Sequence, residues 1–256
     1  MRDHITVPIL AESGFVILDP CAPLTAGAVP DAEWKDLEYT GWRSSGITRF
    51  APLTSYAGDI DCNGFWNWTP PRADKDGVWI SSQTAIAPTL VALAQEPGAN
   101  VGRCRVLELQ PNSYADAVYN LHCDDNNRLN PDGEGWVVRS LLNLTDDPDS
   151  LLILREDRFD PTTEIRIPLP AGSHVIVDTQ RLWHAVWHRG DAPRHALITS
   201  WESGPELAAY IEARHGSTHA PSVPLDEELV AEAQAEMHRR LEERRLLLDS
   251  LSSPGQ

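Results

Sequence analysis

Two histidines, a carboxylate and an arginine are the residues of this chain best suited to chemistry. His122 and Asp124 lie two residues apart in the apolar stretch VYNLHCDD, where the alternation of an extended chain points both side chains to one side. His184 follows in QRLWHAVWH, and Arg194 in APRHALITSW. Two imidazoles and one carboxylate on one face of a metal ion are typical ligands of non-haem Fe(II), and they leave positions open for substrate and oxygen. The pattern therefore predicts an iron centre with an anion-binding arginine behind it.

The third ligand has competitors. The histidines downstream of Asp124 in this region are His174, His184, His188 and His195. His184 is preferred because the sequence before it gives a turn, a strand and an aspartate, and because Arg194 then falls one strand further on. His188 lies on the same face of the same strand and remains a rival. Asp125 is the competing carboxylate, but it neighbours Asp124 and so points to the other face.

Three arginines are predicted to lie inside the fold. Arg194 can bind a carboxylate through its bidentate guanidinium fork, as 2-oxoglutarate requires. Arg139 interrupts the apolar run WVVRSLLNL, where a charge is costly unless it is paired, so we expect it to meet an anion in the interior. Arg105 in CRVLEL follows the same logic, with Glu108 as a competing internal partner.

The elements that position these residues are predicted to be short strands. Turn-forming sequences separate eight apolar runs. The runs are Cys104–Leu109, Ala117–Leu121, Val137–Leu144, Leu151–Arg155, Glu164–Leu169, His174–Val177, His184–Trp187 and Ala196–Trp201. Eight short strands within roughly 100 residues are typical of a double-stranded β-helix, the cupin-like jelly roll. We therefore expect a mainly β fold with a jelly-roll core and flanking helices.

The rest of the chain divides into an irregular start and a helical end. Residues 5–71 are rich in proline and glycine, with a strand predicted at Phe15–Leu18 and a structured loop, DCNGFWNW, near the site. A helix is predicted from Ala87 to Pro97. Ser203 and Glu206 fit a capping box for a second helix, and a third is expected from about Asp226 to Leu251. We expect residues 1–203 to form the oxygenase domain and 204–256 a helical extension packed on it.

Composition excludes several classes of protein. The formal charge is −17, from 21 basic and 38 acidic residues, so no basic stripe offers to neutralise the phosphates of nucleic acid. The N-terminus lacks the apolar core of a signal peptide, and no apolar run is long enough to span a membrane, so we expect a cytoplasmic protein. The acidic balance would suit a cationic substrate, but it more often serves solubility.

The motifs from about Leu90 to Trp201 resemble the Fe(II)/2-oxoglutarate-dependent dioxygenases. The portion comprises RCRVLELQPNS, LHCDD, VVRSLLNL, the turn before HVIVD, WHAVWH and the Arg194 strand. It looks most like the aspartyl/asparaginyl β-hydroxylase branch, which includes bacterial cis-proline hydroxylases. The loop CNGFWNW is similar to an N-terminal element of those enzymes. Ala196 departs from the pattern, because some of the family carry Ser two positions after the arginine.

The resemblance implies a set of roles. His122, Asp124 and His184 would hold Fe(II), Arg194 would bind the distal carboxylate of 2-oxoglutarate, and Arg139 would help anchor cosubstrate or substrate. The candidate substrate-contacting residues are Arg105, Asn126, Asn127, Arg128 and Trp183. The carboxylate of Asp124 argues against a halogenase, which needs a small residue there to make room for halide.

The expected reaction is O2-dependent hydroxylation of an unactivated C–H bond in a free amino acid or a small amino-acid-derived metabolite. Hydroxylation of a peptidyl Asp or Asn, desaturation and cyclisation stay open. So do two readings from other classes, a metal-dependent cupin lyase, isomerase or cofactor-independent dioxygenase, and a non-catalytic jelly-roll binding protein. The long C-terminal helix is a candidate homodimer contact.

Overall fold

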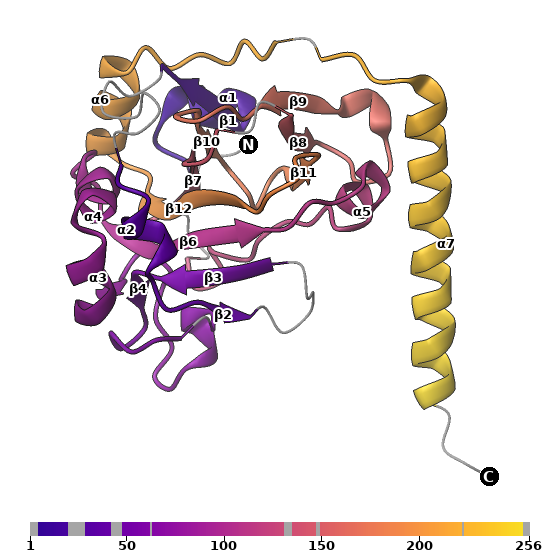
Figure 1. Ribbon diagram of the computed structural model, residues 1–256. Coiled ribbons are helices and arrows are strands. Elements are labelled where there is room, and N and C mark those ends of the chain that lie inside the picture. The colour runs from indigo at the N-terminus through magenta and orange to yellow at the C-terminus, as the bar shows by residue number, and fades with distance from the viewer. Residues whose placement is uncertain are drawn as a thin grey trace.

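The computed structural model describes residues 5–19, 29–41, 48–61, 63–130, 135–146, 149–221 and 223–252. Two antiparallel sheets face one another, with helices on their outer sides (Figure 1). Over these residues, no helix is long and apolar enough to cross a membrane.

The larger sheet has seven strands in the order β1-β10-β7-β12-β6-β3-β2. In that order they are Phe15–Leu18, His174–Val177, Val137–Asn143, Arg194–Glu202, Val101–Leu109, Thr48–Pro52 and Thr40–Gly41. The pairs β1–β10, β10–β7, β7–β12, β12–β6, β6–β3 and β3–β2 are all antiparallel. Strands distant in sequence therefore lie side by side, as a jelly roll requires.

The smaller sheet has the order β11-β8-β9, with the bounds Trp183–His188, Ser150–Arg155 and Ile165–Pro168. A separate pair joins β4 (Thr54–Ser55) to β5 (Val78–Trp79). The apolar cluster between the two main sheets comprises Phe15, Leu141, Leu152, Leu154, Ile167, Leu169, Val175, Val177, Leu182, Ala196 and Ile198. Burying each larger aliphatic side chain stabilises the fold by about 1.5–3 kcal/mol, so this cluster holds the two sheets together.

Helices cover the outer faces of both sheets. The larger sheet is covered by α1 (Pro8–Ser13), α2 (Ala32–Lys35), α4 (Pro88–Gln95) and α6 (Pro205–Ala213). Helix α3 (Ser81–Ile86) lies against α4, and two short 3-10 helices are η2 (Phe65–Asn67) and η3 (Pro161–Thr163). Helices α5 (Tyr114–Tyr119) and α7 (Glu227–Ser252) cover the smaller sheet. The predicted mainly β fold with flanking helices is confirmed, as are the predicted α4 and the strand β1.

The predicted strand at Ala117–Leu121 is wrong, because α5 occupies this stretch. Ser113 caps α5: its Oγ accepts the Asp116 N–H at 3.0 Å, and a carboxylate oxygen of Asp116 accepts the Ser113 N–H at 3.3 Å. This reciprocal capping box fixes the helix start. The chain becomes extended only after Asn120, just before His122.

The capping box predicted at Ser203 is also wrong, although α6 itself is present. Gly204 is the N-cap and contributes no side-chain hydrogen bond. The Ser203 hydroxyl instead accepts the backbone N–H of Thr6 at 3.1 Å, which ties the start of the chain to the end of β12. In the N-terminal part, predicted to be irregular, β2 and β3 add two strands to the larger sheet.

Helix α7 matches the helix predicted from Asp226. Ala233 and Met237 are buried against α5 and the smaller sheet, with Leu229 and Leu241 packed beside them. The C-terminal turns of α7 stand apart from the sheets (Figure 1). There Leu246, Leu247 and Leu248 are more than half exposed.

Candidate metal centre

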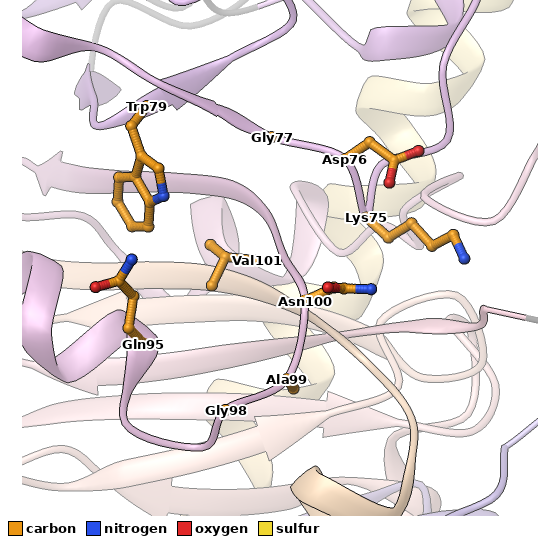
Figure 2. A pocket seen from close by; sticks show the side chains of 9 residues that line it. All are labelled: Lys75, Asp76, Gly77, Trp79, Gln95, Gly98, Ala99, Asn100 and Val101. Carbon is orange, nitrogen blue, oxygen red and sulfur yellow. The ribbon is translucent and has the colours of Figure 1, made fainter.

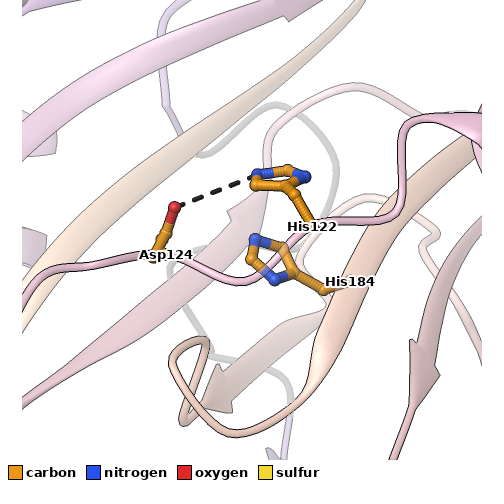
Figure 3. A group of neighbouring side chains, drawn as sticks. All are labelled: His122, Asp124 and His184. Carbon is orange, nitrogen blue, oxygen red and sulfur yellow. Dashed lines mark ion pairs between the residues drawn. The ribbon is translucent and has the colours of Figure 1, made fainter. Parts of the chain in front are cut away.

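Backbone pairing brings the predicted ligands together. The residues His122 and His184 exchange both N–H···O bonds, at 3.3 and 3.0 Å, so a short extended segment continues the edge of the smaller sheet. Asp124 follows two residues after His122. Its backbone N–H donates to the Thr179 carbonyl at 2.8 Å, and this bond fixes the position of Asp124. One ligand atom from each of the three side chains lies within 4.8 Å of the others (Figure 3). Among the described residues this is the metal-ligand cluster that the sequence predicted.

Hydrogen bonds orient both imidazoles. The Nδ1 atom of His122 lies 2.9 Å from the Asn120 carbonyl, and that of His184 lies 3.3 Å from the Leu182 carbonyl. A carbonyl oxygen can only accept, so each Nδ1 carries the proton and each Nε2 presents its lone pair. The His122 Nε2 lies 3.9 Å from Asp124 Oδ1. Two nitrogens and one carboxylate oxygen therefore converge.

The other oxygen of Asp124 is held by the protein. Its Oδ2 accepts hydrogen bonds from Arg139 Nε at 3.1 Å and from the Thr179 hydroxyl at 3.0 Å. Burial alone would raise the pKa of Asp124, but the guanidinium of Arg139 and the imidazoles of His184 and His122 hold that pKa well below its usual range. The carboxylate is therefore ionised and presents Oδ1 as a single ligand atom.

Arg139 is beside the centre, as predicted, and each end of its guanidinium meets a protein group. One terminal nitrogen donates to the Ser200 hydroxyl, and the other donates to the Asn126 amide oxygen at 2.5 Å. The Asp74 carboxylate lies 3.9 Å from Arg139 and 2.5 Å from Arg103. In this geometry Arg139 orients the ligand carboxylate of Asp124.

The inner face of the larger sheet carries a row of arginines. Register pairs Arg139 with Ser200, Arg105 with Ile198 and Leu107 with Ala196. Side chains alternate along strands, so Arg103, Arg105, Arg139 and Arg194 all point toward the smaller sheet. Arg194 is 1% exposed and lies at the start of β12, where register pairs it with Leu109, whereas Ser200 lies near the end of that strand.

The four remaining candidates for substrate contact have different surroundings. Asn126 is buried and joins Asp124, Thr179, Arg103 and Arg139 in one network. Asn127 is buried. Its side-chain amide donates to the Val137 carbonyl at 2.9 Å, and its amide oxygen accepts the Val137 N–H at 2.6 Å. Arg128 is exposed, with its guanidinium 4.2 Å from the Trp66 ring centroid. Trp183 packs with the cluster on the outer side of the smaller sheet, because it precedes His184 and alternation turns it away.

The rival ligand His188 lies outside the cluster. Its Nδ1 meets the Ser150 hydroxyl at 2.9 Å and its Nε2 lies 2.6 Å from the Ala192 carbonyl. Both ring nitrogens are thus used in holding the turn between β11 and β12. His174 and His195 lie on the other face of the larger sheet, against Ser140 and Glu108 respectively.

Four residues around the centre were not among the sequence-based candidates: Asp74, Arg103, Thr179 and Ser200. Arg103 was within reach of prediction, since it stands two residues before Arg105 on one strand face. Asp74 comes from an irregular segment, and only tertiary packing brings it to Arg103.

A separate groove of about 430 Å³ lies where residues 75–79 pass the start of β6 (Figure 2). Its lining includes Lys75, Trp79, Gln95 and Asn100, and no residue of the metal cluster. This groove is therefore distinct from the centre.

No protein-family model matches the chain, and no curated protein matches it. Solved structures give remote matches. An oxidoreductase of the 2OG-Fe(II) oxygenase family from Burkholderia pseudomallei gives a TM-score of 0.45 at 13% identity, over 78% of this chain and 91% of that chain. The non-heme alpha ketoglutarate dependent epimerase SnoN from nogalamycin biosynthesis gives 0.46 at 16%, over 86% and 91%. A prolyl-4-hydroxylase from Pseudomonas putida gives 0.36 at 15%, over 77% and 97%. With TM-scores below 0.5, the function is inferred from the site itself.

Proposed function

We propose that this protein is a non-haem Fe(II)- and 2-oxoglutarate-dependent dioxygenase that hydroxylates an unactivated C–H bond of a free amino acid or small amino-acid derivative. The observation that carries the proposal is the convergence of His122, Asp124 and His184, with one ligand atom of each within 4.8 Å of the others. Two neutral imidazoles and one ionised carboxylate are the donor set that suits Fe(II) with open coordination positions.

The side chains present fit iron. Each imidazole is locked with Nε2 toward the cluster, and Asp124 offers Oδ1 while Oδ2 is occupied. When bound, Fe(II) with O2 would couple the oxidative decarboxylation of 2-oxoglutarate to oxidation of the substrate. Hydrogen bonds from the protein to a ligand carboxylate typically tune metal affinity. We therefore expect Arg139 and Thr179, which both donate to Asp124, to contribute to the affinity for iron.

The remaining roles concern the two organic molecules. Arg194 is proposed to bind the distal carboxylate of 2-oxoglutarate, since it is buried and lies on the same inner sheet face as Arg139, at the other end of β12 from the Arg139 partner Ser200. The apolar cluster between the sheets would exclude water around the reacting atoms. The protein's share of catalysis is then orientation and a dry site.

Turnover tests this proposal. Protein loaded with Fe(II) is incubated with 2-oxoglutarate, air and a panel of L-amino acids, and succinate and products are measured by mass spectrometry. We expect succinate in step with a product one oxygen atom heavier. Arg194→Ala should abolish this turnover, while Arg189→Ala, which removes a half-exposed arginine from the turn before β12, should leave it unchanged.

Other outcomes identify the alternatives. Iron retention with neither succinate nor an Arg194 effect would favour a metal-dependent lyase or isomerase. Failure of the purified protein to retain iron would favour a binding protein. Product that forms only on peptides would indicate a peptidyl hydroxylase, and loss of two hydrogens would indicate a desaturase or cyclase.

We also propose that the exposed end of α7 pairs with a second copy of this chain. Leu246, Leu247 and Leu248 are 55%, 60% and 54% exposed, beyond the part of α7 that packs on α5. Light scattering after gel filtration should give twice the chain mass of 28.4 kDa, and Leu247→Glu with Leu248→Glu should halve it. A monomeric wild type would contradict this.

A further inference from the structure

Helix α5 leads directly into the metal ligand His122. The helix ends at Tyr119, and the next residue, Asn120, is its C-cap. The backbone N–H and the side-chain amide of Asn120 both donate to the Asp116 carbonyl, at 3.0 and 2.8 Å. The Asn120 carbonyl in turn accepts the hydrogen bond from His122 Nδ1 at 2.9 Å. The last turn of α5 therefore sets the direction in which the His122 imidazole points.

Few other groups hold the His122 side chain. It is 58% exposed, whereas the side chain of Asp124 is 21% exposed. Among the described residues, its ring makes polar or ring contacts only with Asn120, Asp124 and His184. The last two are the other metal ligands themselves. The orientation of the His122 imidazole therefore depends on the helix that precedes it.

Helix α5 is too short to be stable by itself. It has six residues, and a helix of this length is unstable in water unless it packs against other elements. Its buried residues Tyr114, Ala117 and Val118 belong to one apolar cluster with residues of the smaller sheet and of α7. Figure 1 shows α5 beside α7. The stability of α5 thus depends on the docking of α7.

Helix α7 contacts α5 through an ion pair and an apolar side chain. Arg240 Nη1 lies 2.8 Å from Asp116 Oδ1, and the Arg240 guanidinium lies 5.4 Å from the Tyr119 ring centroid. The other carboxylate oxygen of Asp116 belongs to the capping box of α5. Met237, about one turn before Arg240, is fully buried in the cluster beside α5. Arg240 therefore connects α7 to both the first and the last turn of α5.

A second connection runs from α7 to the residues that precede both histidine ligands. Gln234 of α7 donates to the Phe159 carbonyl at 2.8 Å, in the turn after β8. Arg158 in the same turn donates to the Tyr119 carbonyl at 2.7 Å, and its guanidinium lies 5.4 Å from the Trp183 ring centroid. Tyr119 ends α5, and Trp183 immediately precedes the second histidine ligand. The docked α7 thus supports the metal site at two points.

The attachment of α7 to the rest of the protein is limited. Of its side chains that the structure describes, only Ala233 and Met237 are buried. Arg239 and Arg245 form ion pairs with acidic residues of α7 itself. An element with few buried apolar contacts opens more readily than the core of a protein. Helix α7 can therefore undock while the two sheets stay folded.

We infer that docking of α7 and binding of the metal by the triad are coupled, with Arg240 as a residue that positions His122 through α5. This inference rests on the proposed function and concerns the regulation of its metal site. When α7 is docked, α5 is held and the His122 imidazole faces the other two ligands. When α7 undocks, that imidazole loses its orientation. Because coupling between two sites is reciprocal, the metal also stabilises the docked helix.

Fe(II) affinity, measured under argon by competition with a chelator, tests the coupling. Met237→Glu should undock α7, because it places an unpaired charge in the buried cluster. We expect Fe(II) to bind about tenfold more weakly or worse, the range typical of lost groups that orient a metal ligand. Ala235→Glu adds the same charge at an exposed position of α7 and should leave the affinity unchanged. Circular dichroism and a cooperative unfolding transition establish that both variants fold.

Arg240→Gln tests the ion pair without disturbing the apolar cluster. It should weaken Fe(II) binding about threefold, since a partly exposed ion pair contributes little energy. Arg240→Lys keeps the charge and should retain most of the affinity. Arg239→Gln is the matched control, because the partners that the structure describes for this neighbouring arginine are Glu236 and Glu243 of its own helix. Its Fe(II) affinity should equal that of wild type.

Hydrogen exchange of the wild-type protein tests the reciprocal effect. The amides of α5 and of residues 227–241 should exchange more slowly with Fe(II) bound, by a factor similar to the loss of affinity in Met237→Glu. The amides of α6, which covers the larger sheet, should exchange at an unchanged rate. Equal slowing in α6 would mean that the metal stabilises the whole fold and would contradict a specific coupling to α7.

Unchanged Fe(II) affinity in Met237→Glu and Arg240→Gln, or equal losses in Arg240→Gln and Arg239→Gln, would overturn the inference. If Met237→Glu did not fold, the comparison of the two arginine variants would still decide. The proposed function is judged separately, by succinate formation in wild type. The expected pattern of Fe(II) affinities without succinate would refute the 2-oxoglutarate function but support the coupling. Succinate formation with equal Fe(II) affinities in all variants would do the reverse.

Discussion

His184 and His188 point to the same side of β11 but have different partners. The first converges with His122 and Asp124, and the second uses both ring nitrogens on Ser150 and Ala192. We predict that His184→Ala loses iron with little change in melting temperature. His188→Ala should keep iron but lose about 1–3 kcal/mol of unfolding free energy, because it leaves buried polar groups unsatisfied.

Iron content by elemental analysis and urea unfolding check both variants. If His188→Ala lost the metal and His184→Ala kept it, the assignment of the third ligand would be reversed.

Thr179 tests whether the groups behind Asp124 tune the metal. It is 1% exposed and donates to Asp124 Oδ2 at 3.0 Å. We predict that Thr179→Val, nearly equal in shape, weakens Fe(II) affinity about tenfold, within the range typical of lost outer hydrogen bonds. Competition with a chelator measures this. Thr199→Val, at an equally buried threonine that contacts Cys104, serves as the control and should leave the affinity unchanged.

At the scale of elements, the strands were predictable where polar and apolar residues alternate, or where a continuous apolar run is buried on both faces. The predicted runs Val137–Leu144, Leu151–Arg155 and His174–Val177 match β7, β8 and β10 to within a residue at either end. The run at Ala117–Leu121 failed because a short apolar run has no period that separates strand from helix. The Ser113-x-x-Asp116 cap was the signal that decided it.

The ligands were predictable because their identity and spacing are local. His122 and Asp124 point to the same side as long as the chain between them is extended. The chain is extended there, although the preceding residues form α5. Asp74 was not predictable, because it lies in a loop and no periodicity links a loop to the strand on which it packs. The same limit applies to β3, whose residues pair with residues of β6 that lie 53 to 61 positions later in the chain.

The contact of β6 with the 74–77 segment depends on glycine. A Cβ on Gly102 would lie 1.5 Å from the Asp74 carbonyl oxygen, so the backbone carrying Asp74 would have to move. We predict that Gly102→Ala lowers the free energy of unfolding by about 2 kcal/mol or more and weakens iron binding, since Asp74 pairs with Arg103.

Thermal unfolding and iron titration check this variant against Gly41→Ala, whose new Cβ meets nothing within 4 Å. The Gly41 variant should be within about 0.5 kcal/mol of wild type or slightly stabilised. Equal unfolding free energies and equal iron affinities in Gly102→Ala and Gly41→Ala would contradict the close packing of Gly102 against Asp74.

At the scale of the whole molecule, net charge is a poor guide to the site. The chain carries −17 overall, yet Arg103, Arg105, Arg139 and Arg194 share the inner sheet face. In the proposed complex the charges of Fe(II) and of the 2-oxoglutarate dianion would cancel, and the carboxylates of Asp74 and Asp124 offset two of the four arginines. The remaining positive charge would favour a carboxylate-bearing molecule over the cationic one that the bulk composition suggested.

His174 makes stability depend on pH. It is 3% exposed, beside the Ser140 hydroxyl and the Trp201 ring. Burial, and to a lesser degree the charge of Arg214, lowers the pKa of His174 to about 3. Below the unfolded pKa of about 6.5 the unfolded chain binds a proton that the folded one does not. Stability from this residue is therefore complete above about pH 6.5 and is lost as pH falls toward 3.

The expected loss is about 1.4 kcal/mol for each pH unit in that window. Urea unfolding between pH 6 and 4 should show that His174→Gln flattens the wild-type slope by about this amount. His219→Gln, at an exposed histidine, should keep the wild-type slope. An unchanged slope in His174→Gln would place the acid sensitivity elsewhere.

The most direct test of the central claim is anaerobic absorption spectroscopy of the metal-free protein titrated with Fe(II) and then with 2-oxoglutarate. A weak visible charge-transfer band should appear in wild type only when both are present. It should be absent in Asp124→Ala, which loses a ligand, and should need far more 2-oxoglutarate in Arg194→Ala. Iron that binds without any such band would contradict the 2-oxoglutarate assignment and point to a metal-dependent enzyme of another class.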